Sequence, residues 1–153
     1  MIALEIISAI FLYILDTIYN MRTQRAKAII YTGSECLVVK NRFSIRNDGF
    51  GLPGGGVERS ETPEEALYRE LKEELGLTRE HITTISRLGS ATTTNTSFIG
   101  PKKTEYIFFK VVCEQKPLLK HSFEIKQSQW IPEANLLPTL SSFYQSLLSE
   151  ARK

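Results

Sequence analysis

The sequence predicts an α+β fold in which helices pack on a mixed β-sheet, and three observations support this prediction. Strand-forming residues come first along the chain, in the segment AKAIIYTGSECLVVK. A helical pattern follows over residues 63–75, and strand patterns return in HITTISRLGSATTT and TEYIFFKVV. A second helical pattern after Pro138 closes the chain. Strands and helices grouped in this way are typical of α+β proteins or of a mixed sheet covered by helices.

The first half of the chain can be divided into elements from its residues. Two apolar runs flank the turn cluster Thr32-Gly33-Ser34, which predicts a hairpin. The polar segment 41–50 is expected to be a connection, and residues 50–53 a short strand. The helix over 63–75 has clear end signals: Thr62 and Glu65 form a capping-box pattern, and Gly76 is a natural stop. Its buried stripe is expected to be Leu67, Leu71 and Leu75.

The second half alternates between strand and loop patterns. Alternating and β-branched residues predict strands over 81–94 and 104–112, with a polar loop between them at 95–103. Residues 116–127 are expected to be irregular, and the segment SQWIP a short strand that ends at its proline. The predicted C-terminal helix carries one apolar stripe, formed by Leu140, Phe143, Tyr144, Leu147 and Leu148.

Residues 1–21 form a segment of a different character, an apolar N-terminal helix. There is no basic region before the apolar run, so a signal peptide is not expected. Glu5 and Asp16 leave only ten uncharged residues between them, whereas a membrane-spanning helix needs roughly 20, so a membrane span is not expected either. The apolar surface must be buried somewhere. Packing on its own domain or on a second copy in a homodimer is favoured over a membrane surface, although Arg22, Arg25 and Lys27 follow directly.

Length, charge and cysteine content narrow the class of protein. The 153 residues are enough for one domain with a proper core, and the formal net charge of +2 is too weak to indicate a DNA-binding surface. Cys36 and Cys113 match no zinc or redox spacing. We expect two buried thiols in a reducing compartment, and therefore a cytoplasmic protein.

Three glutamates stand on one face of the predicted helix 63–75, next to its buried stripe. Glu70, Glu73 and Glu74 have the spacing i, i+3 and i+4, which brings neighbouring side chains together. Taken alone, such a set is more typical of a solvated charged face. The glycines at 54–56 favour a binding site instead, because a loop without side chains lets backbone carbonyls approach a ligand. Carboxylate and carbonyl oxygens are the ligands that Mg²⁺ prefers.

The same stretch resembles the Nudix box, the pattern G-x5-E-x7-R-E-U-x-E-E-x-G-U in which U is aliphatic. Gly55, Glu61 and the run RELKEELGL at 69–77 match every specified position. The resemblance implies a Nudix α/β/α sandwich with a mixed β-sheet, and it extends over about residues 25–150. The predicted organisation is therefore the N-terminal helix at 1–21 followed by a Nudix hydrolase domain at 22–153.

The resemblance also implies an activity and a set of site residues. Nudix hydrolases are Mg²⁺-dependent pyrophosphohydrolases, with Mn²⁺ as an alternative metal, that cleave a nucleoside diphosphate linked to another moiety. By position, Glu70, Glu73, Glu74 and the Gly55 carbonyl would hold the metal. Glu61 and Arg69 would form a supporting ion pair.

A further glutamate is expected from a loop that precedes a Trp-containing strand. Glu124, six residues before Trp130, is the best candidate for this extra ligand or base, and Glu105 and Glu114 are weaker ones. The general base is either Glu70 or Glu124, and the sequence does not separate them.

Substrate identity is the least defined part of the prediction. Arg42, Arg46 and Lys103, with Lys102, are candidates for binding phosphates or for a solvated surface. Phe50, Phe98 and Tyr106 would stack on a base or pack in the core. Signals of the ADP-ribose and dinucleoside polyphosphate subfamilies, a proline and a tyrosine past the box, are replaced by threonines at 92–94. A small nucleotide is therefore expected, and the alternative is a non-catalytic nucleotide-binding module.

Overall fold

The computed structural model describes residue 7 and residues 23–44, 48–97 and 100–153 of the chain. The helix expected over 1–21, apart from residue 7, therefore lies outside the described residues, as do Arg46 and Phe98. Within the described ranges, no helix is long and apolar enough to cross a membrane.

The described residues contain a single five-stranded mixed sheet, with the strand order β3-β4-β1-β2-β5. The central strand β1 pairs in parallel with β4, and the other neighbours pair antiparallel. The strands are β1 (Thr23–Thr32), β2 (Glu35–Asn41), β3 (Thr84–Ser97), β4 (Gly100–Val112) and β5 (Ile125–Pro132).

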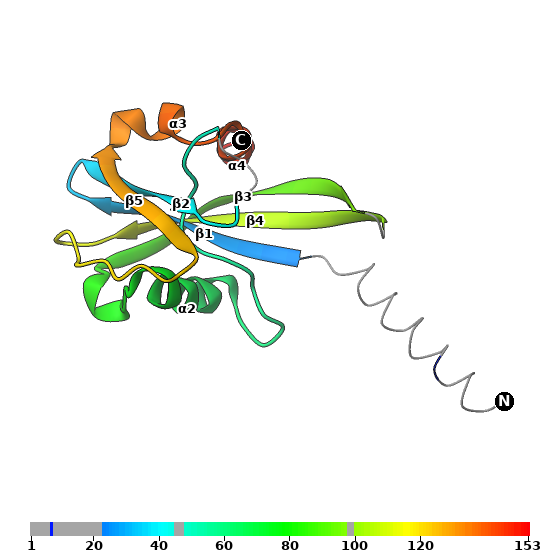
Figure 1. Cartoon of the computed structure of the whole chain (residues 1–153), viewed down its shortest axis with the longest axis horizontal. Helices are drawn as coiled ribbons and strands as arrows, with labels where there is room; N and C mark the ends of the chain where they lie inside the picture. Colours follow the sequence, from blue (N-terminus) through cyan, green and yellow to red (C-terminus); the bar gives the residue numbers. More distant parts are fainter. Residues whose placement is uncertain (1–6, 8–22, 45–47, 98–99) are drawn as a thin grey trace.

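Helices cover both faces of the sheet, as Figure 1 shows. Helix α2 (Pro63–Leu75) lies on one face, while α3 (Leu136–Thr139) and α4 (Ser142–Ala151) lie on the other. Short 3₁₀ turns occur at η1 (Arg79–His81) and η2 (Glu133–Asn135). The expected α+β arrangement with a mixed sheet between helices is confirmed.

The alternation of side chains along β1 divides the core into two layers. Ala26, Ala28 and Ile30 belong to the cluster under α2, whereas Ile29 and Tyr31 belong to the cluster under α3 and α4. Successive side chains of a strand point to opposite faces, so a central strand covered on both sides supplies apolar residues to both. β1 therefore contributes side chains to both core layers.

The ends of α2 are those predicted from the sequence. The Thr62 hydroxyl accepts from the Glu65 N–H at 3.2 Å, and the Glu65 carboxylate accepts from the Thr62 N–H at 2.8 Å. Gly76 ends the helix with φ 69°, in the left-handed region that glycine tolerates best. The β1–β2 hairpin is confirmed as well, with Gly33 at φ 56° in its turn.

Several predicted boundaries are wrong. β3 begins at Thr84 rather than at residue 81, β5 begins at Ile125 rather than at residue 128, and Leu140 lies before α4 rather than in it. Residues 95–97 and 100–103, expected to be loop, continue β3 and β4, because Asn95 pairs with Lys102 and Ser97 with Gly100. Cross-strand pairing here outweighs local turn composition. Residues 50–53 form isolated bridges rather than a strand, through Phe50 with Leu140 and Gly51 with Val39.

The core under α2 provides a test of the fold. Leu71 is fully buried there, whereas Leu118 is 84% exposed. Leu71→Ala should lower the free energy of unfolding by about 2–5 kcal/mol, because it removes buried methyl groups and leaves a cavity. Leu118→Ala should change it by less than about 0.5 kcal/mol. Urea unfolding followed by circular dichroism measures both, and equal losses would contradict the assignment of α2 to the core.

Candidate active site

The glycine loop before α2 is anchored along one edge of β1. The Ala26 N–H donates to the Gly55 carbonyl at 2.9 Å, and the Ala28 N–H donates to the Pro53 carbonyl at 3.0 Å. Gly54 has φ 111°, and a Cβ at this position would collide with the Ala26 carbonyl oxygen. Only glycine allows the loop to lie so close to the strand.

Gly55 brings the loop against α2. A Cβ at Gly55 would collide with the carboxylate of Glu70, so the missing side chain leaves room for this glutamate. The loop backbone is thus packed between β1 and the first carboxylate of the helix face.

Glu74 is the buried member of the helix carboxylates, with 6% of its surface exposed. Its Oε2 accepts from the Gly54 N–H at 2.7 Å. Burial raises the pKa of the Glu74 carboxyl, and the charges of Glu70 and Glu124 act in the same direction, while Lys27 and the Gly54 N–H lower it. A nearby cation would stabilise this crowded negative charge.

Lys27 is a site residue that the sequence interpretation missed. This side chain is 6% exposed, and its ammonium donates to the carbonyl oxygens of Gly54 and, at 3.2 Å, of Leu52. Its charge also acts on the Glu74 carboxylate. The available signal was a lysine inside the apolar strand run AKAII, because lysine is almost never buried without a partner.

Arg69 and Glu61 form a bidentate ion pair. Arg69 Nε lies 2.6 Å from Glu61 Oε1, and Nη2 lies 2.9 Å from Oε2. The Arg69 hydrogen bonds, followed by that of the Glu58 N–H, lower the pKa of Glu61 to about 2. Arg69 also donates to Glu70 Oε1 at 3.0 Å and to the Gly56 carbonyl at 3.0 Å. One guanidinium therefore joins the loop to the carboxylate face of α2.

Glu70, Glu73 and Glu74 share a pocket of about 500 Å³ with Glu124. We call it the carboxylate pocket. Glu124 comes from the loop before β5, which is docked on the end of α2: the Ser122 N–H donates to the Glu74 carbonyl and the Lys120 N–H to the Leu75 carbonyl, both at 2.9 Å. The lining residues are Arg25, Lys27, Asn41, Phe43, Gly54, Gly55, Gly56, Glu70, Glu73, Glu74, Ser122, Phe123 and Glu124.

The donor set of this pocket fits a hard divalent cation, since carboxylate and carbonyl oxygens predominate. Among the described residues, however, no three acidic, histidine or cysteine side chains are grouped closely enough to hold a metal. The carboxylates are instead turned towards protein donors, Glu74 to the Gly54 N–H and Glu70 to Arg69. The Gly55 carbonyl keeps a second lone pair beyond its bond to Ala26. The donor types therefore fit a divalent cation, while Glu74 and Glu70 accept hydrogen bonds from protein groups in this structure.

A second pocket of about 590 Å³ adjoins the first and shares Arg25, Lys27, Asn41, Phe43 and Glu74 with it. Four aromatic side chains also line this aromatic pocket: Phe50, Tyr106, Phe143 and Tyr144. The rings of Tyr106 and Phe143 meet edge-on at 5.4 Å, as do those of Phe143 and Tyr144. Phe50 and Tyr106, the candidates for base stacking, thus line a pocket that Glu74 also lines.

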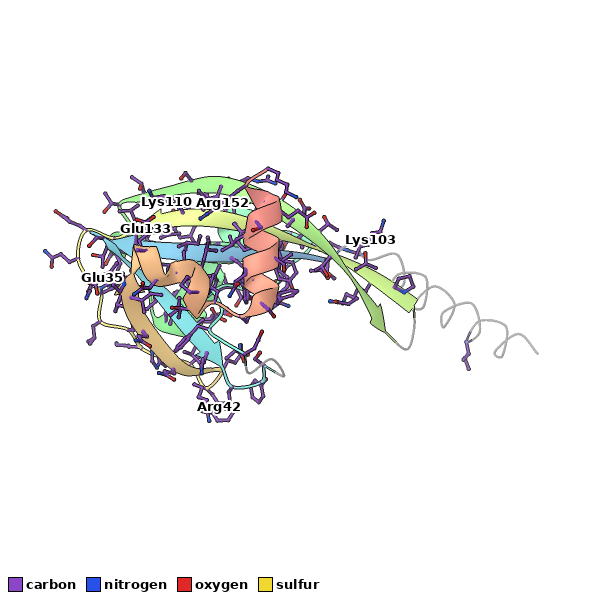
Figure 2. All side chains as sticks on the ribbon, turned by 90° about the horizontal axis from the view of Figure 1, so that it is seen from above. Glu35, Arg42, Lys103, Lys110, Glu133 and Arg152 are labelled. Atoms are coloured by element: carbon purple, nitrogen blue, oxygen red, sulfur yellow. The ribbon has the colours of Figure 1, made fainter. Side chains whose placement is uncertain are left out.

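The other candidates are not all brought to the site. Arg42 lines the aromatic pocket, but Lys103 lies on the β3–β4 hairpin, outside the described linings of both pockets and well apart from Arg42 in Figure 2. Glu105 is occupied elsewhere, because Gln24 donates to it at 2.8 Å and Arg87 lies 3.8 Å away. Glu114 is exposed beyond the end of β4. Of the three candidate extra glutamates, the described pocket contains only Glu124.

A known family model matches most of this chain. The model of the NUDIX domain matches residues 21–150. The chain belongs to the NUDIX domain family. Solved structures with this fold include the dihydroneopterin triphosphate pyrophosphohydrolase of E. coli, with TM-score 0.67, 18% identity and coverage of 80% of this chain and 88% of that one. A MutT protein from Methanosarcina mazei has TM-score 0.65, 25% identity and coverage of 80% and 87%.

Curated relatives of this NUDIX domain match over a short region. The RNA pyrophosphohydrolase of Xylella fastidiosa is 55% identical over 38 residues, which is 25% of this chain and 20% of that protein. The RNA pyrophosphohydrolase of Stenotrophomonas maltophilia is also 55% identical over 38 residues, 18% of its length. The chain thus matches about a fifth of the length of these relatives.

The Arg69–Glu61 pair predicts a pH dependence of stability. Because the pKa of Glu61 falls from 4.5 to about 2 on folding, its stabilising contribution is complete above pH 4.5 and disappears as the pH approaches 2. Wild type should therefore be more stable than Glu61→Gln at pH 7, and the difference should shrink between pH 4.5 and 2. Urea midpoints at pH 7, 4.5, 3 and 2 measure this difference. A difference that stays constant with pH would contradict the pairing.

Proposed function

We propose that this NUDIX domain is a Mg²⁺-dependent pyrophosphohydrolase that cleaves a nucleoside diphosphate linked to another moiety by attack of a metal-activated water. The observation that carries the proposal is one pocket lined by Glu70, Glu73, Glu74 and Glu124 beside the Gly55 loop. The names of the RNA and dihydroneopterin triphosphate pyrophosphohydrolases among its relatives support the same chemistry. Mn²⁺ is an alternative metal.

Each group in the pocket has a role in this proposal. Glu70, Glu73, Glu74 and the Gly55 carbonyl would hold the metal. When bound, Mg²⁺ supplies charge neutralisation at the pyrophosphate and lowers the pKa of a bound water. Lys27, held by two loop carbonyls, keeps the Gly54 loop in place.

Glu124 is our choice for the general base over Glu70. Glu70 Oε1 already accepts a hydrogen bond from Arg69 at 3.0 Å, and Glu70 is one of the proposed metal ligands. Glu124 is exposed at the pocket and belongs to a different element from the helix carboxylates. Its role would be to take the proton of the attacking water, a contribution of about 10²–10⁴-fold in rate.

The aromatic pocket would hold the base of the nucleotide. Phe50, Phe143 and Tyr144 offer rings for stacking, and Arg25 and Lys27 lie where this pocket meets the carboxylates. The products would be a nucleoside monophosphate and the phosphorylated second moiety. A non-catalytic nucleotide-binding module is the alternative, and the complete set of carboxylates argues against it.

We further propose a cytoplasmic location and a role for residues 1–21 in packing or homodimer formation. The first rests on two buried free thiols, Cys36 and Cys113. The second rests on the apolar sequence of the segment alone.

The substrate class can be tested with a panel of compounds. Nucleoside triphosphates and nucleoside diphosphate derivatives should be turned over with higher kcat/KM than ADP-ribose or a dinucleoside tetraphosphate, because the signals of those subfamilies are replaced by threonines. Turnover should require added Mg²⁺ or Mn²⁺ and stop with EDTA. Phosphate release, coupled to a pyrophosphatase where pyrophosphate is the product, measures it. Nucleotide binding without turnover of any compound would favour the binding module.

The proposed metal-ligand set can be tested at Glu74. Glu74→Gln should lower kcat by at least about 10²-fold, because it removes a charge from the proposed ligand set. Glu64→Gln, an exposed position in the first turn of the same helix, is the matched control and should keep wild-type kcat. Circular dichroism verifies that both variants fold. Full activity of Glu74→Gln at saturating Mg²⁺ would remove Glu74 from the ligand set.

A further inference from the structure

Arg42 makes three contacts with the segment that carries Glu124. Its backbone N–H donates to the Glu124 carbonyl at 2.7 Å. Its side-chain Nε donates to the Phe123 carbonyl at 2.9 Å, and the guanidinium lies over the Phe123 ring, 4.7 Å from its centroid. Backbone, side-chain nitrogen and guanidinium face are therefore all directed at the two residues 123 and 124.

An irregularity in the sheet explains how Arg42 reaches this segment. β2 and β5 pair regularly up to Lys40 and Gln127, and then the register shifts so that Asn41 lies opposite Ile125. A bulge of this kind bends the end of a strand and redirects its side chains. The next residue, Arg42, is thereby placed opposite Glu124 and continues the pairing beyond the ends of both strands.

The Glu124 loop is thus held from two sides. On the helix side, the N–H groups of Lys120 and Ser122 are bonded to the carbonyls at the end of α2. On the strand side, the contact is made by Arg42. Phe123, between the two anchors, is 72% exposed, and its ring meets only Phe43 and Arg42 among the ring contacts of the described residues. Phe123 is therefore too exposed to hold its part of the loop by apolar packing.

We propose that Arg42 is a positioning residue, which fixes the 122–124 loop so that the Glu124 carboxylate stays in the carboxylate pocket. This differs from the expectation that Arg42 binds substrate phosphates. A guanidinium that stacks on a ring and donates through Nε is used for its shape, which lysine does not share. The inference rests on the proposed function, because it assigns Glu124 a part in the reaction.

Replacement by lysine separates the two roles. Arg42→Lys keeps the positive charge but loses the planar face and the Nε donor. A positioning role predicts that Arg42→Lys and Arg42→Ala both lower kcat by about 10-fold or more, with KM within about twofold of wild type. Phosphate binding instead predicts near-normal kinetics for Arg42→Lys and a raised KM for Arg42→Ala. That second result would overturn the proposal.

Arg79 offers a matched control. Its guanidinium also stacks on an aromatic ring, 3.7 Å from the centroid of Tyr68, but it lies outside both described pockets. Arg79→Ala should leave kcat and KM unchanged. A loss equal to that of Arg42→Ala would mean that the kinetics report general stability, and it would also overturn the proposal.

A double-mutant cycle tests whether Arg42 acts through Glu124. Glu124→Gln alone should lower kcat, while Glu105→Gln, on β4 and bonded to Gln24, should not. If Arg42 works by placing Glu124, Arg42→Ala should cause little further loss in the Glu124→Gln background. Multiplicative losses would show that the two residues act independently, against the proposal.

Hydrogen exchange distinguishes failure of this inference from failure of the proposed function. If wild type turns over no compound of the panel, the proposed function fails by itself. The effect of Arg42 on the loop can still be measured by amide exchange. Arg42→Ala should speed exchange at the Ser122 and Ile125 amides, which are hydrogen-bonded in the wild type, and Arg79→Ala should not. Unchanged exchange at both amides would refute the positioning role whatever the kinetics.

Discussion

The site depends on the close packing of a glycine loop between a strand and a helix. Gly54 and Gly55 lie where a Cβ would collide with the Ala26 carbonyl on one side and the Glu70 carboxylate on the other. This contact holds Glu70 of α2 close to the central strand β1, and the hydrogen bond from the Gly54 N–H places Glu74. The capped ends of α2 and the Leu stripe beneath it hold the helix against this loop.

Packing so many carboxylates together has an electrostatic cost that two cations reduce. Lys27 is buried beside Glu74 and bonded to the loop carbonyls, and Arg69 spans Glu61, Glu70 and the Gly56 carbonyl. Both cations bond to the backbone of the glycine loop as well as acting on acidic side chains. The same two cations therefore reduce the repulsion between the carboxylates and hold the glycine loop. A divalent cation in the proposed site would act on the same negative charges.

The carboxylate pocket is completed by a segment remote in sequence. Backbone bonds to the end of α2 and the contacts of Arg42 bring Glu124 to the helix face, some fifty residues after Glu74 in the chain. Phe43, two residues after the end of β2, lines both pockets, so the segment that holds this loop also borders the aromatic pocket. The pocket proposed for the reaction and the pocket proposed for the nucleotide base therefore adjoin each other.

Local signals in the residues were enough for α2, the β1–β2 hairpin and the box carboxylates, because caps, periodicity and motif spacing act over a few residues. The length of β3 and β4 was not predictable in this way. The polar, turn-rich residues there predicted a loop, but pairing opposite Lys102 and Pro101 makes them strand. The same holds for Lys27 and Arg42. The buried Lys27 ammonium and the Arg42 guanidinium have partners distant in sequence, and only the packing of the glycine loop and of the loop before β5 brings those partners together.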